Sequence, residues 1–303
     1  KIYPETESIS VFGGEDLVPP QYGKVFISIK PRIGDFVPSI IKQNIKRDLK
    51  RYSVAGIVPE ILDLKYLFVE TNSKVYFNTN LAPSASFVST KVQRDLTAYA
   101  ESSELNQYGA RFKYSRFLKV IDSSHESVTS NITTVEMRRD LRLAISEVAE
   151  YAIDFGNQFH IKSMNGFNIR SSAFRVLNIN TDVYLYDVPD STGEKGQISL
   201  FSLDEGSSTP VIQRRNVGVI NYQTGRITLD PINIVSGKTK DNVDILEISA
   251  TPESNDVIGL QDLYLQLDKS VVEMVVDQIS SGQDPSGSTY TVTTSYKNGS
   301  IIR

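Results

Sequence analysis

The segment 13–16, Gly-Gly-Glu-Asp, carries the residue types most suggestive of chemistry in this chain. Two glycines permit backbone angles closed to other residues, and two carboxylates follow them as candidate ligands. A proline pair then stiffens the approach to a strand pattern over 24–30. We expect a structural loop whose carboxylates accept backbone hydrogen bonds. This loop comprises Gly13, Gly14, Glu15, Asp16, Pro19 and Pro20.

An enzymatic interpretation of the same segment is weaker. The four residues resemble the GG(D/E)EF signature of cyclases that make cyclic dinucleotides, and those enzymes share a ferredoxin-like core. In that family the signature lies on a hairpin within the sheet, whereas here it precedes the first predicted strand. Leu17 also stands where the signature requires phenylalanine. Placement and residue type therefore argue against a cyclase.

The sequence 236–239, Ser-Gly-Lys-Thr, imitates the end of a phosphate-binding loop. The full pattern needs a glycine five positions before Gly237, where Ile232 stands instead. We expect a polar turn between strands, without a bound phosphate.

The remaining candidates for catalysis or metal binding are two histidines and a small acidic group. His125 and His160 have no accompanying G-x-S-x-G elbow or H-E-x-x-H helix. Asp187, Asp190 and Glu194 depart from the spacing of a calcium loop, which favours a solvated turn. We therefore expect no catalytic residue, no cofactor, no metal site and no enzymatic activity.

Composition narrows the class of protein. The net charge of -4 over 303 residues lacks the basic excess of a dedicated nucleic-acid binder. The absence of cysteine excludes disulfides and thiolate metal sites. No apolar run approaches the roughly 18 residues of a membrane span. The sequence begins at Lys1 with neither methionine nor an apolar signal core, so we expect a fragment of a longer protein.

The first half of the chain alternates strand and helix patterns. Apolar residues at 37, 41, 45 and 49 fall on one helical face, as do those at 88, 92, 96 and 99. A hairpin at Thr71-Asn72-Ser73 would join two strands rich in Tyr, Phe and Val. The predicted order is strand 24–30, helix 35–52, strands 62–70 and 74–80, a helix opening at Pro83-Ser84, and strand 129–137. This βαββαβ order predicts an α+β fold whose first domain is ferredoxin-like.

The predicted secondary-structure pattern changes after Gly156. Residues 144–155 resemble a connecting helix, after which short strand patterns with polar turns predict a β-rich domain resembling a sandwich or barrel. These strands are expected at 173–179, 183–188, 197–203, 211–222, 226–229 and 243–249. The predicted domains are 1–155 (α+β), 156–255 (β-rich) and 256–303, a C-terminal segment with a flexible tail or a hairpin at Asn298-Gly299.

A row of cations flanks the apolar stripe of the first helix. Lys42, Lys46 and Lys50 recur at helical spacing, with Arg47 and Arg51 adjacent. A solvated helix surface explains this pattern. The sharper alternative is an interface with an acidic partner, because charge complementarity steers and orients association.

Three blocks of sequence carry a family resemblance. They are Ile9 to Pro31 (ISVFGGEDLVPPQYGKVFISIKP), Ser127 to Leu141 (SVTSNITTVEMRRDL) and Asn216 to Leu229 (NVGVINYQTGRITL). Together they resemble the C-terminal half of the baseplate wedge proteins of T-even-like bacteriophages, relatives of the J-like baseplate family.

The resemblance implies a structural subunit of a contractile tail, located in the virion and assembled in the host cytoplasm. It also implies a homodimer that contacts neighbouring wedge proteins in an inner ring around the hub, with no nucleic-acid partner and no membrane insertion. Two different contacts are needed for a ring of twofold pairs. A strand at 289–296, with Tyr290 and Val292, is a candidate for one of them by adding to a neighbour's sheet.

A binding module is the alternative from another class. Tyr184, Tyr186, Phe201 and Tyr222 lie in the β-rich region and would present aromatic faces to a carbohydrate or another surface. Packing in a hydrophobic core explains the same residues.

Overall fold

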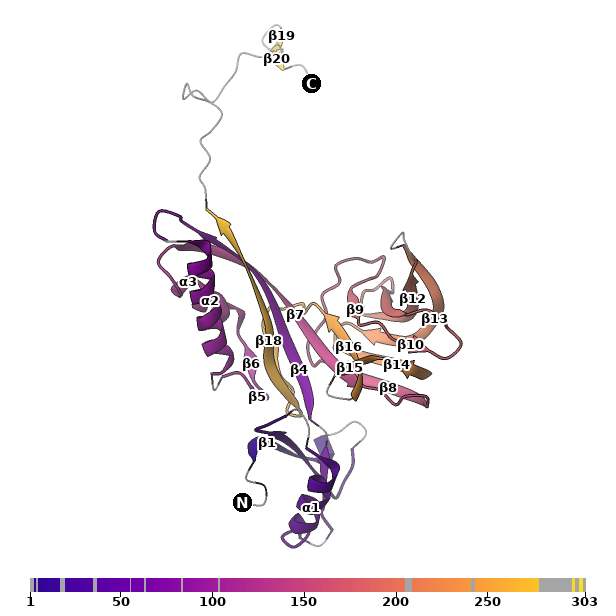
Figure 1. Cartoon of the computed structure of the whole chain (residues 1–303). Helices are drawn as coiled ribbons and strands as arrows, with labels where there is room; N and C mark the ends of the chain where they lie inside the picture. Colours follow the sequence, from indigo (N-terminus) through magenta and orange to yellow (C-terminus); the bar gives the residue numbers. More distant parts are fainter. Residues whose placement is uncertain are drawn as a thin grey trace.

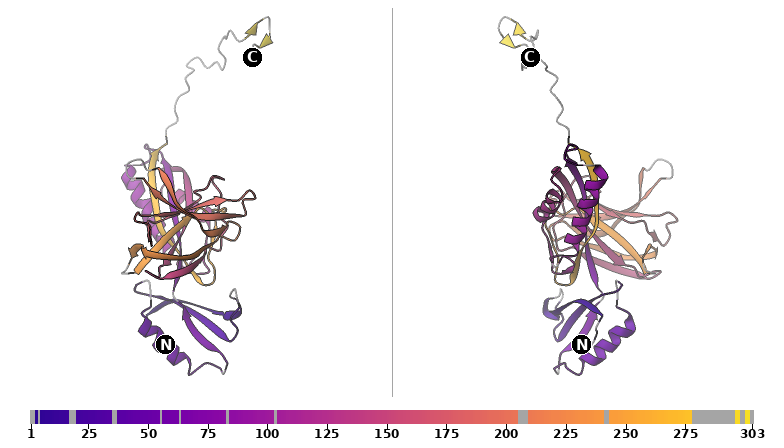
Figure 2. Two further views of the ribbon diagram at one scale, coloured as in Figure 1. Left: turned by 90° about the vertical axis from the view of Figure 1, so that its right-hand side faces the viewer. Right: turned by 60° about the vertical axis from the view of Figure 1, so that its left-hand side comes forward.

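The computed structural model describes most of the chain. The described residues are 3, 5–16, 20–34, 37–54, 56–62, 64–82, 84–102, 104–204, 209–240, 243–277, 296–297 and 300–301. The described strands form three main sheets (Figures 1 and 2). A small N-terminal sheet lies at one end of the molecule, a larger central sheet lies above it, and a second large sheet, called the third sheet below, is set to one side.

The N-terminal unit is a three-stranded sheet with one helix. Its strands are β1 (Thr6–Gly13), β2 (Lys24–Pro31) and β3 (Val58–Leu62), in the order β1-β2-β3. β1 runs antiparallel to β2, whereas β3 runs parallel to β2 and is reached through helix α1 (Ser39–Leu49). A single turn of 3-10 helix, η1 (Gly14–Asp16), follows β1.

Helix α1 uses the apolar face that the sequence predicts. Val37 and Ile45 are buried against Ile29 of β2, and Ile41 and Leu49 pack on the same cluster. The four-residue spacing therefore orients the helix correctly, and its cationic residues lie beside this stripe.

The central sheet has the strand order β15-β16-β7-β4-β18-β5. Two helices, α2 (Ala85–Ala100) and α3 (Tyr114–Ser123), cover one of its faces (Figure 1). β18 runs parallel to β4, although almost 200 residues separate them. The strands are β4 (Lys65–Phe77), β5 (Gln107–Tyr108), β7 (Val128–Arg142), β15 (Lys238–Lys240), β16 (Val243–Ala250) and β18 (Leu263–Val276), and β9 (Ile169–Ser171) adds to β16. The short strands β6 (Arg111–Phe112) and β17 (Val257–Ile258) pair with each other.

The period of two along β4 decides which side receives the helices. Leu67, Val69 and Val75 are fully buried, and they belong to the same cluster as Val88 and Val92 of α2. Ser84 caps this helix by accepting a hydrogen bond from the Phe87 amide at 3.2 Å, as the Pro83-Ser84 pattern predicts.

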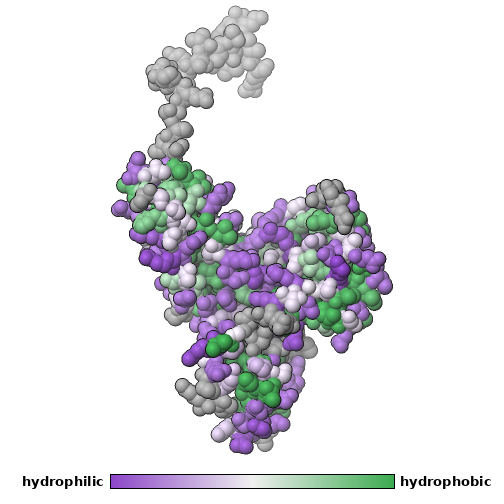
Figure 3. Space-filling model, viewed as in Figure 1, coloured by the Kyte–Doolittle hydropathy of each residue, from purple (hydrophilic) through white to green (hydrophobic). Residues whose placement is uncertain are grey.

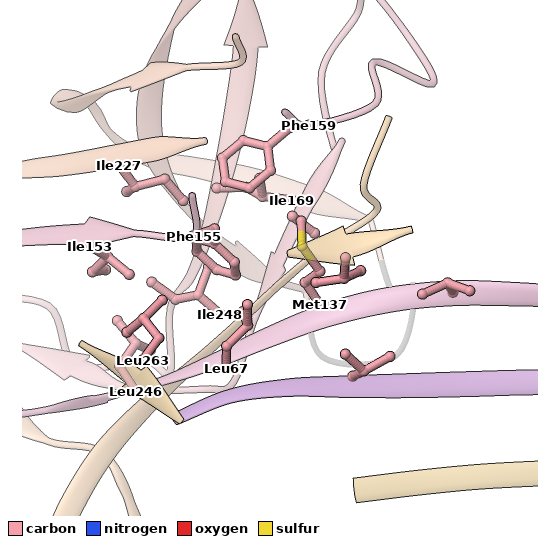
Figure 4. Packing of buried hydrophobic residues seen from close by; sticks show 14 of the residues in the cluster. Leu67, Met137, Ile153, Phe155, Phe159, Ile169, Ile227, Leu246, Ile248 and Leu263 are labelled. Atoms are coloured by element: carbon pink, nitrogen blue, oxygen red, sulfur yellow. The ribbon is translucent and has the colours of Figure 1, made fainter. Parts of the chain in front are cut away.

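The third sheet has the order β10-β14-β13-β12-β11, with β8 paired to β14. Its strands are β8 (Val148–Asp154), β10 (Arg175–Val176), β11 (Tyr184–Pro189), β12 (Lys195–Leu203), β13 (Pro210–Asn221) and β14 (Arg226–Ser236). The central and third sheets share one hydrophobic core, where Leu67 and Met137 meet side chains such as Ile153 and Ile227 (Figure 4).

The predicted ferredoxin-like α+β fold is wrong. Strands make up 52% of the structure and helices 15%, so the chain is β-rich. The expected hairpin at Thr71-Asn72-Ser73 is instead the middle of the single strand β4, in which Thr71 and Ser73 are buried. The expected helix 144–155 is largely strand β8, whose Tyr151 and Ile153 alternate with exposed residues and pair with β14.

The last described residues form a short hairpin. β19 (Tyr296–Lys297) pairs antiparallel with β20 (Ser300–Ile301) on either side of Asn298-Gly299, as that dipeptide predicts. The division into domains 1–155, 156–255 and 256–303 stays a proposal.

Candidate assembly surfaces

Of the predicted cations, Lys46 and Arg47 lie in the last turn of α1, Lys50 and Arg51 follow it, and Lys42 lies in its first turn. Lys42 and Lys46 are half-buried, while Arg47, Lys50 and Arg51 are exposed. The Arg47 Nε lies 3.7 Å from a carboxylate oxygen of Asp48. Positive charges in the last turn complement the helix dipole, which gives these residues a local stabilising role as well as a charged surface.

The loop after β1 depends on a close backbone approach. The Gln21 amide donates to the Gly14 carbonyl at 2.7 Å, and a Cβ on Gly14 would lie 2.0 Å from the Gln21 carbonyl oxygen. Only glycine fits there. Gly13 ends β1, Glu15 and Pro20 are exposed, and Pro19 and the Asp16 side chain lie outside the described residues.

An apolar strip on β1 was not singled out by the sequence patterns. Ile9 and Val11 stand opposite Ile29 and Ile27 of β2, so all four share the face that α1 covers. Because α1 packs over β2 and β3, the β1 part of this face stays open, and Ile9 and Val11 are 54% and 60% exposed. Hydrophobic residues accordingly reach the surface of the N-terminal unit (Figure 3).

The outer edge of β1 is also open. Among the described strands, β1 pairs with β2 alone. An exposed edge with apolar side chains is a template for pairing with another chain. On the opposite face, Ser10 donates from Oγ to the Gln261 carbonyl at 2.7 Å, and the Ser28 and Tyr108 hydroxyls lie 2.9 Å apart. These bonds hold the N-terminal unit against the central sheet.

A cluster of charges covers the face of the central sheet away from the helices. The Arg138 guanidinium contacts Glu70, Asp140 and Asp268, with distances of 2.9 Å to the last two, and lies 4.4 Å from the centre of the Phe68 ring. Burial opposes its charge, but the three carboxylates outweigh it and raise the pKa of Arg138. These side chains join β7, β4 and β18 on this face.

The aromatic residues of the third sheet have mixed exposure. Tyr186 and Tyr222 are buried, whereas Tyr184 and Phe201 are half-buried. Phe201 makes ring contacts with Tyr184, Tyr186 and Phe167 at centroid distances of 5.5, 5.8 and 5.4 Å. Rings that pack on one another leave little flat surface for a sugar, which favours the core-packing interpretation.

The carboxylate of Asp187 is surrounded by hydrogen-bond donors of the protein, which indicates a structural role for it rather than the binding of a cation. Its carboxylate is fully buried and accepts hydrogen bonds from the amides of Asn168 and Ile169 at 2.8 and 2.9 Å. The Asn168 side-chain amide donates to it at 2.8 Å, and the Tyr222 hydroxyl donates at 2.5 Å. Burial and this acidic neighbour raise the pKa of Tyr222.

The other predicted chemical residues are dispersed. Asp190 accepts hydrogen bonds from Thr192 and Gly193 in a turn, which lowers the pKa of its carboxyl. His125 Nδ1 lies 2.8 Å from the Ser127 hydroxyl, and His160 Nδ1 lies 2.7 Å from a Glu253 carboxylate oxygen. Within the part of the chain that the structure describes, no three such groups form a metal-binding cluster.

The segment 236–239, which imitates a phosphate-binding loop, consists mainly of strand residues. Ser236 ends β14, and Lys238 begins β15, where its ammonium donates to Glu247 at 2.7 and 2.8 Å.

Tyr290 and Val292, the predicted strand-addition residues, lie outside the described residues. None of the described helices is long and apolar enough to cross a membrane.

Comparison with known proteins identifies two matching family models. Residues 1–62 match baseplate structural protein gp6, C-terminal domain I, and residues 65–140 match C-terminal domain III of the same protein. The break between them coincides with the end of β3 at Leu62 and the start of β4 at Lys65.

A curated relative agrees with the family models. The chain is 30% identical over 172 residues to baseplate wedge protein gp6 of Enterobacteria phage T4. That alignment covers 55% of this chain and 26% of the relative, so the chain corresponds to about a quarter of the relative's length.

Proposed function

We propose that the chain builds a phage tail baseplate by binding other copies and neighbouring wedge proteins, because residues 1–62 and 65–140 match two C-terminal domains of baseplate structural protein gp6. Its place is the tail baseplate of the virion, and it is the C-terminal part of a baseplate wedge protein. The match of two adjacent family models, divided where the fold passes from β3 to β4, carries this proposal.

The contact between copies is assigned to β1. Two copies of β1 that pair antiparallel around a twofold axis would extend the three-stranded sheet across both molecules. With the axis at Ser10, Ile9 of each copy stands opposite Val11 of the other, so the apolar strip meets itself. Glu7 then stands opposite Gly13, which keeps the two Glu7 carboxylates roughly 20 Å apart at 3.3 Å per residue.

Other registers are less favourable. An axis at Ile9 would place Val11 opposite Glu7, and an axis at Val11 would place Ile9 opposite Gly13. Shifting the pairing by one residue would set Ile9 opposite an even-numbered residue such as Ser10, which faces the central sheet in its own copy, so the two sheets would not join with the same face. The register centred on Ser10 alone matches both apolar side chains with apolar partners.

The second contact is assigned to the cationic end of α1. A ring needs a contact different from the twofold one, and Lys46, Lys50 and Arg51 lie at the end of α1, an element separate from the β1 edge. Its partner is an acidic surface on a neighbouring baseplate protein, so the contact weakens as salt rises.

Solution mass measured against protein concentration tests the β1 contact. We expect the mass to rise from monomer towards dimer, and we expect Ile9→Lys with Val11→Lys to keep the chain monomeric. Ile132→Lys is the matched control, because Ile132 is a strand residue with 59% exposure on β7 of the central sheet. An unaltered dimer in the double variant would remove β1 from the account.

Charge reversal tests the α1 contact separately. The variant Lys46→Glu with Lys50→Glu is expected to leave self-association intact and to abolish co-assembly with neighbouring wedge proteins at low salt. Unchanged co-assembly would leave these residues as a solvated helix surface.

A further inference from the structure

A cavity of about 310 Å³ lies where the three sheets meet. Its walls come from the β3–β4 junction, the end of β7, β8, and the loop before β18. Leu64, Leu141, Ile153 and Leu263 supply apolar surface to it, and Ile153 and Leu263 are seen at the core in Figure 4. This volume is within the range of small-molecule sites.

One buried cation on the cavity wall is incompletely paired. Arg139 is 8% exposed, its guanidinium donates through Nη1 to the Asp154 carbonyl, and its buried Nε has no hydrogen-bond partner. Among the described residues, no carboxylate lies within ion-pair distance of it. An arginine side chain offers five N–H donors, so most of its capacity is unused.

The acidic residues of the cavity have partners of their own. Asp140 accepts from Arg138 at 2.9 Å and from Lys240 at 3.4 Å, and Asp262 accepts from Lys65 at 3.1 Å. The Asp154 carboxylate accepts from the Gly156 amide at 3.1 Å. The carboxylates are thus held by other donors, and the charge of Arg139 is left without a direct counterion.

Leaving a charge buried in this way is unfavourable. Desolvation lowers the pKa of Arg139 to about 10, against the opposing effect of the surrounding carboxylates. The side chain is still protonated at neutral pH, so it is a buried positive charge beside an apolar space. A ligand that combines one negative charge with an apolar stem would pair with the guanidinium and fill the apolar space beside it.

We propose that this cavity binds a carboxylate carried on a short aliphatic stem, with the Arg139 guanidinium as its counterion. The carboxylate belongs either to a free aliphatic acid or to an acidic side chain that a neighbouring chain inserts. An inorganic anion such as phosphate is a poor fit, because it would face the apolar wall with nothing to bury.

Calorimetric titration of the whole chain tests this site. Hexanoate is compared with hexanol and hexylamine, which have similar apolar bodies but no negative charge. We expect hexanoate to bind at least about tenfold more tightly than either, the gain from a charge-assisted hydrogen-bonded pair. Acetyl-Leu-Glu-amide is the second probe, for an inserted side chain.

Variants locate the binding. Arg139→Met is expected to remove the preference for hexanoate, whereas Arg170→Met, at an exposed arginine paired with Glu136, leaves it unchanged. Ala152→Trp blocks the cavity from its exposed rim without altering Arg139 and abolishes binding, which keeps the test decisive if Arg139→Met fails to fold.

The outcomes separate the two sources. Arg139-dependent binding of hexanoate alone assigns the site to a free acid, and binding of the peptide assigns it to a neighbouring chain. Failure of both probes, or equal binding of hexanoate and hexanol, overturns the proposal and leaves the self-association through β1 untouched.

Discussion

Replacing Asp187 tests how the third sheet is held together. Its carboxylate accepts four hydrogen bonds, two from the main-chain amides of Asn168 and Ile169 and two from the side chains of Asn168 and Tyr222. All of these residues are at most 5% exposed, so water cannot easily replace the carboxylate. The network ties the start of β9 to β11 and to the residue that follows β13.

The expected loss follows from the donors left unpaired. Each buried unsatisfied donor costs about 1–3 kcal/mol, so Asp187→Ala, which strands four of them, is expected to lose about 4 kcal/mol or more of unfolding free energy. Asp187→Asn retains one acceptor oxygen and places an amide against the Asn168 side-chain amide. It is therefore expected to lose about 2–4 kcal/mol.

Urea denaturation monitored by circular dichroism measures both losses. Asp190→Asn is the matched control, because Asp190 is an exposed turn residue whose carboxylate accepts from Thr192 and Gly193. It is expected to change the free energy of unfolding far less than either substitution at Asp187. If Asp187→Ala lost less than about 1 kcal/mol, the network would contribute no more than an exposed turn does, and the reasoning would be refuted.

Two further predictions concern the N-terminal unit and its contact with β5 of the central sheet. Gly14→Ala is expected to lower the free energy of unfolding by about 1–3 kcal/mol, because its Cβ would clash with the Gln21 carbonyl. Gly13→Ala is the control, since its Cβ would meet only the flexible Glu15 side chain. Urea denaturation midpoints compare the two variants, and equal midpoints would contradict this expectation. Burial raises the pKa of Tyr108 from 10.0 to about 12, so the folded state keeps a proton that the unfolded state loses in this range. The stability from this group is complete below about pH 10 and falls as pH rises towards 12, and Tyr108→Phe is expected to flatten that fall in denaturation curves; an unchanged slope would contradict it.

Several elements could be predicted from local patterns, because these elements depend on residues that are close together in the sequence. The stripe through Ile41, Ile45 and Leu49 gave the inner face of α1, and Ser84 capped α2. Short apolar runs between polar turns predicted β11, β12, β13 and the start of β14 in the third sheet. They did not predict that β14 continues to Ser236, and β8 was predicted as a helix.

The errors arose where distant residues decide the structure. Thr71, Asn72 and Ser73 have turn-like character, yet β7 and β18 pair with them on both sides and hold them in one strand. Residues 148–154 pair with β14, a strand almost 80 residues later, which no local pattern reveals. Tertiary pairing overrides weak local preference in both cases.

The candidate surfaces divide in the same way. Charge spacing pointed to α1, because side chains four residues apart share a helical face. The β1 strip was missed, since Ile9 and Val11 look like ordinary strand residues until α1 is seen to cover only β2 and β3. The buried charge of Arg139 likewise depends on the three sheets meeting around it.

Disulfide trapping across β1 tests the assembly contact most directly. The chain contains no cysteine, so Ile9→Cys with Val11→Cys introduces the only thiols. In the register centred on Ser10, each Cys at position 9 lies opposite the Cys at position 11 of the other copy, within the Cα separation that a disulfide requires. Mild oxidation is expected to give a covalent dimer much faster than for the control Ile132→Cys. Cross-linking no faster than that control would contradict pairing of the chain through β1.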